Sequence, residues 1–355
     1  MSGERAASIT FERVTKSYGD VAAVREVSFA IAPASLVTLL GPSGCGKTTT
    51  LRLIAGLETP TAGRILIGGQ DVTALTATDR NVSMVFQSYA LFPHMTVLDN
   101  VAYGPSVTGR PRRDAQAAAR ASLATVGLAG LEARLPSELS GGQQQRVAIA
   151  RALVLEPGVL LFDEPLSNLD ARLRRQVREE IRELQRRLGI TVVYVTHDQE
   201  EALAVSDRII VMNSGGIAQD GPPRDLYERP TDAFVAGFMG EANRVKGVLE
   251  RLDGEIGRVT IAGFQCTLPH RGLTDGVVDV AIRPEAILIA RGPVTDGALG
   301  GTVSHAAYLG SRMEYSITTE IGELFVTSPA AGDPLSSGVS VTLTLADHGV
   351  TLIRP

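Results

Sequence analysis

The eight residues from 41 to 48 constrain the fold of this chain more than any other segment. They read Gly41-Pro42-Ser43-Gly44-Cys45-Gly46-Lys47-Thr48, which matches the pattern G-x-x-x-x-G-K-[ST]. The apolar run 36–40 precedes them and a stretch of helical character follows, so strand, loop and helix occur in the order that the pattern requires. The segment therefore predicts an α/β fold in which a glycine-rich loop joins a buried strand to a helix.

Each part of this loop is suited to bind the negatively charged phosphate groups of a nucleotide. Its glycines let consecutive backbone N–H groups turn toward phosphate oxygens, and the following helix presents its positive end to them. Lys47 supplies a compact positive charge, and the Thr48 hydroxyl is suited to ligate Mg²⁺. The competing interpretation, a glycine-rich turn that closes a strand, is poorly supported, because only three lysines occur in the chain and one stands here. We predict ATP and Mg²⁺ as cofactors, with the nucleotide bound by Gly41, Pro42, Ser43, Gly44, Cys45, Gly46, Lys47, Thr48 and Thr49.

A pair of acidic residues follows the apolar run 159–162. Asp163 stands at the end of this predicted buried strand, where the metal partner of a phosphate loop is expected. Glu164 comes one residue later, where it can orient or deprotonate an attacking water, which suits hydrolysis better than transfer to an organic acceptor. Such a pair is weak evidence by itself, and it becomes strong in combination with the loop.

Two sequence textures divide the chain into two predicted domains. Up to about Val211, β-rich runs alternate with helix-like stretches, which is typical of a mostly parallel sheet covered by helices. After Gly240 the runs are short and β-branched, with Gly and Pro turns, and they indicate a small all-β barrel or sandwich. The predicted domains are therefore 1–240 and 241–355. Residues 221–238 contain three prolines, and we expect them to form a connector packed on the first domain.

Charge and cysteine content exclude several classes of protein. With 34 Lys and Arg against 39 Asp and Glu, the net charge of -5 has the wrong sign for a protein that binds nucleic acid through its phosphates. The arginine-rich stretch 171–188 is interpreted as a solvated amphipathic helix, because glutamates alternate with its arginines. Two cysteines, Cys45 and Cys266, are too few for a disulfide scaffold, and no run approaches the roughly 18 apolar residues that cross a bilayer. We expect a reducing, cytoplasmic compartment, no signal peptide and no membrane span.

A short string between the phosphate loop and Asp163 carries a family resemblance. Leu139-Ser140-Gly141-Gly142-Gln143 resembles the signature motif of ATP-binding cassette (ABC) ATPases. The family's other motifs follow in order, namely Tyr18, Gln87 in Phe86-Gln87-Ser88, Ser167-Asn168-Leu169-Asp170 after Glu164, and His197 in Thr196-His197-Asp198. The resemblance implies an α/β P-loop NTPase cassette, with a mixed sheet core and a helical subdomain at about 88–155, that hydrolyses ATP to ADP and phosphate.

The resemblance also assigns roles to single residues, each of which has a structural alternative. Tyr18 would stack on adenine, although half-buried tyrosines are also ordinary core residues. Gln87 would reach the metal or its water, and His197 would contact the γ-phosphate, although a lone histidine is usually structural. The implied catalytic residues are Glu164, His197 and Gln87, and the implied metal ligands are Thr48, Gln87 and Asp163.

Members of this family work as paired cassettes, so one cassette per chain implies a homodimer. Each copy binds ATP on its own phosphate loop while the signature motif of the other copy closes over the γ-phosphate. ATP then binds the closed state much better than the open one, and hydrolysis removes that difference in affinity. The residues assigned to this role across the dimer are Ser140, Gly141, Gly142, Gln143 and Asp170. Asn168 departs from the small residue that many relatives carry at its position.

Further resemblances concern partners and cargo. The segment from Gln87 to His94 resembles the surface on which a cytoplasmic helix of a membrane subunit docks, although Leu91 and Phe92 would also suit a protein core. The last third, with Ile282-Arg283-Pro284-Glu285, resembles the OB-like regulatory (TOBE) domain attached to ATPases of binding-protein-dependent importers. This domain would either sense a regulatory ligand or extend the dimer interface. The stretches 86–95, 181–199 and 307–315 look most similar to the ferric-iron group, with polyamine and aminoethylphosphonate relatives close behind.

The resemblance thus implies a transport ATPase on the cytoplasmic face of the inner (plasma) membrane. Its partners would be two integral-membrane permease subunits and, through them, a periplasmic or lipid-anchored solute-binding protein, with no nucleic acid. A soluble ABC ATPase of DNA repair or translation is the alternative from another class. Chromosome-type members insert a long coiled coil between loop and signature, whereas Thr48 and Leu139 are only 91 positions apart (139 − 48), and translation-type members carry two cassettes. A non-hydrolysing sensor is disfavoured because Glu164 and His197 are both present.

Overall fold

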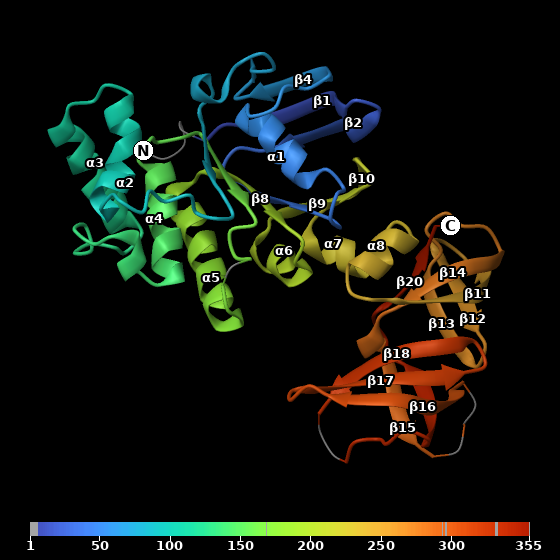
Figure 1. The fold of residues 1–355 in the computed structure, drawn as a ribbon. Coiled ribbons are helices and arrows are strands. Elements are labelled where there is room, and N and C mark those ends of the chain that lie inside the picture. The colour runs from blue at the N-terminus through green and yellow to red at the C-terminus, as the bar shows by residue number, and fades with distance from the viewer. Residues whose placement is uncertain (1–5, 168, 293, 295–296, 331–332, 355) are drawn as a thin grey trace. The chain divides into compact units, whose positions relative to one another are not determined.

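The apolar run before the phosphate loop forms the centre of a parallel sheet (Figure 1). All residues of this strand are buried, as expected for a strand covered on both faces. Neighbouring strands of the sheet run parallel, except that the edge strand β10 is antiparallel to β9. The six strands in spatial order are β10 (Gly216–Gly221), β9 (Arg208–Asn213), β3 (Leu36–Leu40), β8 (Thr191–Thr196), β7 (Val159–Asp163) and β6 (Val82–Val85).

The computed structural model of the protein describes residues 6–167, 169–292, 294, 297–330 and 333–354. Asn168, within one of the predicted motifs, lies outside the described residues. The chain forms two compact units, Met1–Pro223 and Arg224–Pro355. The predicted domain boundary after residue 240 does not coincide with the division between these units, and it stays a prediction.

A second, antiparallel sheet shares its core with the parallel one. Its strands are β2 (Val21–Ile31), β1 (Ile9–Tyr18), β4 (Ala62–Ile67) and β5 (Gln70–Asp71). Phe11 of β1 and Phe29 of β2 stack with their ring centroids 4.5 Å apart. The helix α1 (Lys47–Ala55) contributes Leu51, Leu53 and Ile54 to the buried cluster that also contains residues of β1, β3 and β8. The predicted α/β fold with a mixed sheet core is confirmed, and the core fixes α1 directly behind the loop.

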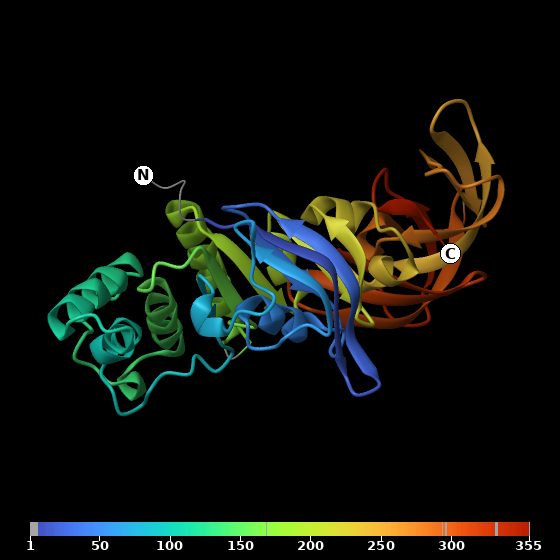
Figure 2. The same ribbon diagram turned by 90° about the horizontal axis from the view of Figure 1, so that it is seen from above.

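Helices form one end of the first unit, away from β1 and β2 (Figure 2). They are α2 (Val97–Val107), α3 (Arg112–Thr125) and α4 (Gly141–Leu153), and their apolar faces share a buried cluster. The long helix α5 (Ala171–Leu188) packs its Val177, Ile181 and Leu184 against residues of α4. The short helix α6 (Gln199–Val205) follows β8. No helix within the described residues is long and apolar enough to cross a membrane.

The second unit is built from two antiparallel sheets around one apolar core. The first sheet has the order β13 (Phe264–Pro269), β12 (Ile256–Ile261), β11 (Asn243–Arg251), β14 (Gly276–Ile282) and β20 (Val350–Ile353). The second has the order β15 (Ile287–Arg291), β19 (Ser340–Leu345), β16 (Leu299–Tyr308), β17 (Arg312–Thr319) and β18 (Gly322–Pro329). This arrangement agrees with the predicted all-β, OB-like fold.

The connector differs from the sequence-based expectation. It forms the helices α7 (Pro223–Glu228) and α8 (Ala233–Phe238), and the buried Arg283 of the second unit binds both of them. Its guanidinium donates to the Ala236 carbonyl at 2.9 Å and to the Tyr227 carbonyl, and it lies 4.0 Å from the centroid of the Tyr227 ring. These contacts anchor both helices to the β strands, and residues 224–238 belong to the second compact unit, whereas the sequence-based expectation assigned the connector to the first domain.

Candidate active site

The predicted site residues gather at one edge of the parallel sheet. β3, β8, β7 and β6 are neighbours and run parallel, so their carboxyl ends lie at the same edge. The phosphate loop follows β3, and His197 follows β8. Asp163 ends β7 with Glu164 directly after it, and Gln87 follows β6. The topology thus brings together four segments that are far apart in the sequence.

The phosphate loop owes its shape to glycine backbone. Gly44 and Gly46 have φ values of 78° and 103°, in the left-handed region that side chains rarely adopt. A Cβ atom on Gly46 would lie 2.4 Å from the carbonyl oxygen of Ala23 in β2, so the loop also approaches backbone too closely for any side chain. Gly46 caps α1 without a side-chain hydrogen bond, and the first N–H groups of that helix therefore face the loop as donors for an anion.

Lys47 is buried and binds the phosphate loop through its ammonium group. The residue is 5% exposed, and its Nζ donates to the carbonyl oxygens of Gly41 at 2.7 Å and Pro42 at 2.9 Å. The charge is thereby held at the loop before any ligand binds, where it can turn to a phosphate oxygen, a stronger acceptor than a carbonyl. Thr48 and Thr49 continue the first turn of α1 and are partly exposed.

Asp163 lies partly buried beside the negative charge of Glu164, which is favourable for binding a cation. Burial raises the pKa of the Asp163 carboxyl and the charge of Glu164 raises it further, while Arg52 and Lys47 lower it. The described residues contain no group of three or more His, Cys, Asp or Glu side chains placed to hold a metal ion. Asp163 and the Thr48 hydroxyl therefore suit Mg²⁺ only together with phosphate oxygens, which matches the preference of this ion for substrate ligands.

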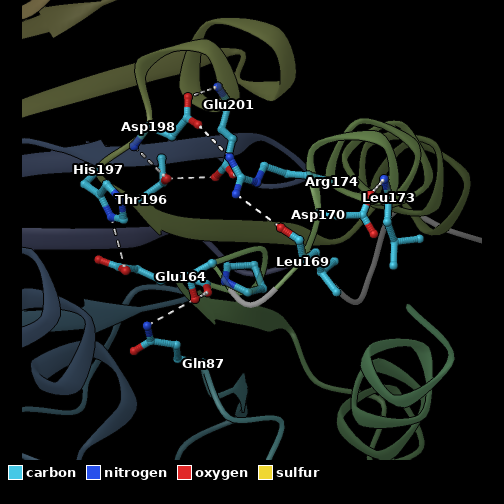
Figure 3. Close-up of polar contacts among 12 residues, drawn as sticks. Gln87, Glu164, Leu169, Asp170, Leu173, Arg174, Thr196, His197, Asp198 and Glu201 are labelled. Carbon is cyan, nitrogen blue, oxygen red and sulfur yellow. Dashed lines mark hydrogen bonds and ion pairs between the residues drawn. The ribbon is translucent and has the colours of Figure 1, made fainter. Parts of the chain in front are cut away.

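Glu164 and His197 contact each other across the sheet edge (Figure 3). Nδ1 of His197 lies 3.2 Å from Oε2 of Glu164, and the two side chains are 60% and 23% exposed. The Glu164 backbone has φ 45°, which is unusual for a residue with a side chain, and its N–H donates to the Val195 carbonyl at 3.0 Å. Because a fixed backbone holds an acidic side chain toward an exposed histidine, the pair can orient a water and accept its proton.

Gln87 joins this pair through a serine. Its Nε2 donates to Ser167 Oγ at 3.1 Å, and this hydroxyl donates to the Glu164 carbonyl at 3.0 Å (Figure 3). Gln87, Glu164 and His197 therefore form one connected set, although no local feature of the sequence places them together. Their catalytic and metal-binding roles stay predictions.

The signature residues lie at the starts of α4 and α5, where Ser140, Gly141 and Asp170 are exposed and Gly142 is buried. Ser140 caps α4, where its Oγ accepts from the N–H of Gln143 and the Gln143 side chain accepts from the Ser140 N–H at 2.9 Å. Asp170 caps α5 by accepting from the Leu173 N–H at 2.9 Å. Gly142 approaches the Leu173 side chain, and Gly141 approaches the Leu169 side chain. Among the described residues, no hydrogen bond or ion pair joins residues 140–143 to the loop 41–48.

Tyr18 ends β1 and is 48% exposed. The ammonium of Lys16 lies 4.9 Å from the centroid of its ring and also pairs with Glu58 at 2.7 Å. The exposure is compatible with a ring that stacks on a base, and it disfavours the alternative that Tyr18 is an ordinary core residue. The stacking itself stays a prediction.

The segment from Gln87 to His94 borders a surface groove of about 500 Å³. Its apolar lining includes Phe86, Phe92, Tyr103 and Leu155. Arg151, from the C-terminal end of α4, shapes this groove: it donates to the carbonyls of Tyr89 at 2.8 Å and Ala90 at 2.7 Å. Both carbonyls belong to residues with positive φ, so one arginine stabilises a strained turn beside Gln87.

Sequence reasoning missed three residues that organise these segments. They are Arg151, Arg174 and Glu201. Glu201 is 4% exposed, and it lies four positions after His197 on the buried face of a short helix. A charged residue at an inward position of an otherwise apolar helix face is the signal that could have marked it. Nothing in the local sequence distinguishes Arg151 or Arg174 from the many other arginines.

Comparison with known proteins matches both parts of the chain. A family model described as ABC transporter matches residues 24–167, and one described as TOBE domain matches residues 280–353. The chain is 58% identical over all of both chains to the Fe(3+) ions import ATP-binding protein FbpC of Brucella abortus. It is 57% identical to FbpC 1 of Rhizobium meliloti and 48% identical to FbpC of Pasteurella multocida, each over 98% of both chains.

Two solved structures resemble part of the chain. One is cbiO1 from Clostridium perfringens, part of the ABC transporter complex cbiONQ, with TM-score 0.58 and 28% identity over 62% of this chain and 90% of that one. The other is a dimeric ATP-binding cassette, MJ0796, in a post-hydrolysis state bound to ADP and Pi. Its TM-score is 0.54 and its identity 32%, over 61% of this chain and 99% of that one.

Proposed function

The chain belongs to the ABC transporter family of ATP-binding proteins, and from this premise we propose that it is the ATP-hydrolysing subunit of a binding-protein-dependent importer of ferric iron. The observation that carries the cargo is the set of relatives named for Fe(3+) import, which are 48% to 58% identical across 98% to 100% of both chains. Polyamines (spermidine or putrescine) and 2-aminoethylphosphonate remain the alternative cargoes, because the same machinery serves them.

The residues at the sheet edge have separate roles in ATP binding and hydrolysis. The backbone N–H groups of the loop, with Lys47, bind and orient the phosphates, and Tyr18 stacks on the adenine. Thr48, Asp163 and Gln87 are the ligands proposed for Mg²⁺, which when bound neutralises charge that develops on the phosphate oxygens. Glu164 accepts a proton from a water while the water oxygen bonds to the γ-phosphorus and the bond to the leaving ADP oxygen breaks. His197, 3.2 Å from Glu164, orients that carboxylate and contacts the γ-phosphate.

The signature residues act across a homodimer. Ser140, Gly141 and Asp170 are exposed at the starts of two helices. Among the described residues, neither they nor Gly142 and Gln143 form a hydrogen bond or ion pair with the chain's own loop. The N-terminus of α4 offers N–H donors and a positive dipole end to an anion from outside the chain. Two copies related by symmetry therefore complete two sites. The dimeric state of the similar cassette MJ0796 supports this arrangement.

The groove lined by Phe86, Phe92, Tyr103 and Leu155 is the proposed docking site for the permease subunits. It suits an apolar helix face, and it borders Gln87, so a docked helix can influence the site through that residue. The two permeases and a solute-binding protein place the chain at the cytoplasmic face of the inner membrane. The TOBE domain either extends the dimer interface, which we favour, or senses a ligand, and deletion of residues after 241 separates these roles through dimer stability and regulation.

The proposal is tested by uptake and by ATP turnover. Cells of the source organism that carry wild type, Glu164→Gln or the exposed control Glu179→Gln are supplied with labelled ferric iron and, in parallel, labelled putrescine. Loss of iron uptake alone in Glu164→Gln supports the proposal, and loss of putrescine uptake alone moves the cargo to polyamines. Purified protein is then assayed with permeases and loaded binding protein. Turnover that these partners do not stimulate would favour a soluble ABC ATPase of DNA repair or translation.

A further inference from the structure

Arg174 lies between two segments that carry candidate site residues (Figure 3). It belongs to the first turn of α5, and its Nη2 donates to the Leu169 carbonyl at 3.2 Å, immediately before Asp170. Its Nη1 lies 3.6 Å from Oδ2 of Asp198, immediately after His197. Its Nε lies 3.8 Å from Oε1 of Glu201. One guanidinium thus faces the segment that carries Asp170 and the turn that carries His197.

Hydrogen bonds to Glu201 hold the turn that carries His197 in place. Its Oε2 accepts from Thr196 Oγ1 at 2.7 Å and from the Tyr194 hydroxyl at 3.2 Å. Thr196 Oγ1 in turn accepts from the Asp198 N–H at 3.0 Å, so residues on both sides of His197 are tied to one buried carboxyl. Glu201 is 4% exposed, and this burial raises the pKa of its carboxyl.

The guanidinium does not use its full hydrogen-bonding capacity. Its Nε is buried, and among the described residues no acceptor lies within hydrogen-bonding distance of it. The separations from Asp198 and Glu201, 3.6 and 3.8 Å, are also just beyond that distance. A displacement of about half an ångström would convert both contacts into charge-assisted hydrogen bonds, which are the stronger kind. The link is therefore incomplete here and can tighten when either segment moves.

We propose that Arg174 is a positioning residue that couples the Asp170 segment to the His197 turn. This inference rests on the proposed function, that is, on a homodimer in which the partner copy contacts the segment that carries Asp170. Engagement moves the Leu169 carbonyl, the guanidinium follows, and its closer contact with Asp198 and Glu201 sets His197 against Glu164. A planar fork suits this task because it holds three acceptors in fixed directions, whereas a lysine ammonium holds them as a point charge.

The test compares Arg174→Ala and Arg174→Lys with Arg175→Ala in the full-length protein. Arg175 is the matched control, since it neighbours Arg174, its side chain is 77% exposed and the ion partner found for it among the described residues is Glu179, one turn along the same helix. We expect Arg174→Ala to lower kcat for ATP about 10-fold with KM changed less than about 2-fold, because misplaced catalytic groups affect the reaction more than binding. The kcat of Arg174→Lys should lie between those of wild type and Arg174→Ala. An Arg174→Ala kcat equal to that of Arg175→Ala would overturn the proposal.

A double variant tests the coupling itself. If Arg174 transmits the effect of Asp170, then Asp170→Ala with Arg174→Ala should lose no more kcat than the worse single variant. Losses that multiply would show two independent roles and contradict the proposal. A thermal unfolding curve and a nucleotide-binding measurement for each variant distinguish a folding defect from a loss of catalysis. If Arg174→Ala fails to fold, the kcat of Arg174→Lys is compared with that of Arg175→Ala instead. A wild-type protein without ATP turnover would instead refute the proposed function.

Discussion

The phosphate loop and the signature residues, two halves of one proposed ATP site, are built in opposite ways. The loop is shaped by contacts within the chain: Gly46 lies against the backbone of β2, and Lys47 binds loop carbonyls from a buried position. Ser140 and Gly141 are exposed whereas Gly142 is buried, and neither of these two glycines has a positive φ. The fold of this chain therefore requires glycine in the loop but not at Gly141. This difference agrees with the proposed homodimer, in which the signature residues act on the site of the partner copy rather than within their own chain.

The largest effect is expected from Gly46→Ala. The new Cβ would meet the Ala23 oxygen at 2.4 Å at a φ of 103°, so the free energy of unfolding should fall by about 2–4 kcal/mol and ATP binding should be lost. Denaturant unfolding and nucleotide titration measure both. Gly44→Ala is the control, because its φ is 78° but its Cβ would enter open space, and it should cost only about 1–2 kcal/mol. Equal costs at the two positions would contradict the close-approach argument.

Gly141→Ala should separate folding from catalysis. Its Cβ would meet only the tip of the Leu169 side chain at 3.2 Å, so the unfolding free energy should stay within about 0.5 kcal/mol of wild type. ATP binding to the loop should also persist, whereas turnover should fall roughly 100-fold, because the added methyl crowds the donors that would face the partner's phosphate. A destabilisation as large as that of Gly46→Ala would break the comparison between the two halves.

Ser140→Ala should have a smaller and local effect on stability. It removes the side chain that caps α4 and forms the capping box with Gln143, which should lower the unfolding free energy by about 1 kcal/mol. Ser137→Ala is the control, since Ser137 is exposed nearby but does not cap this helix. No change in Ser140→Ala relative to the control would mean that the cap contributes nothing in the isolated chain.

The smallest effect concerns how the buried Glu201, which binds the turn that carries His197, makes stability depend on pH. Burial raises the pKa of Glu201 in the folded protein, so its contribution to stability is fully present below the pKa of the unfolded chain and is lost as pH rises through the folded pKa. Glu201→Gln cannot ionise and should lack this decline, so its unfolding free energy should fall less than that of wild type between about pH 4 and neutral pH. Parallel pH profiles for the two proteins would contradict this assignment.

Much of the fold was predictable because its signals are local. The run before the phosphate loop, the alternation of strand and helix patterns and the short β-branched runs after Gly240 each follow from neighbouring residues, and the structure confirms the fold class that they indicate. The connector was not predictable. Its helices are anchored by Arg283, about fifty residues further along the chain, and a local pattern carries no record of that partner.

The sequence by itself determined the chemistry of the site: which residues are glycine, which carry charge and which end the apolar runs. It also determined the order of the motifs, which is why the family could be recognised. Only the tertiary structure decided which of these residues touch. Parallel pairing of β3, β8, β7 and β6 gathers their carboxyl ends at one edge, and there His197 meets Glu164 and Gln87 meets Ser167. Arg174 and Glu201 became visible for the same reason, because burial and long-range contact are properties of the folded chain.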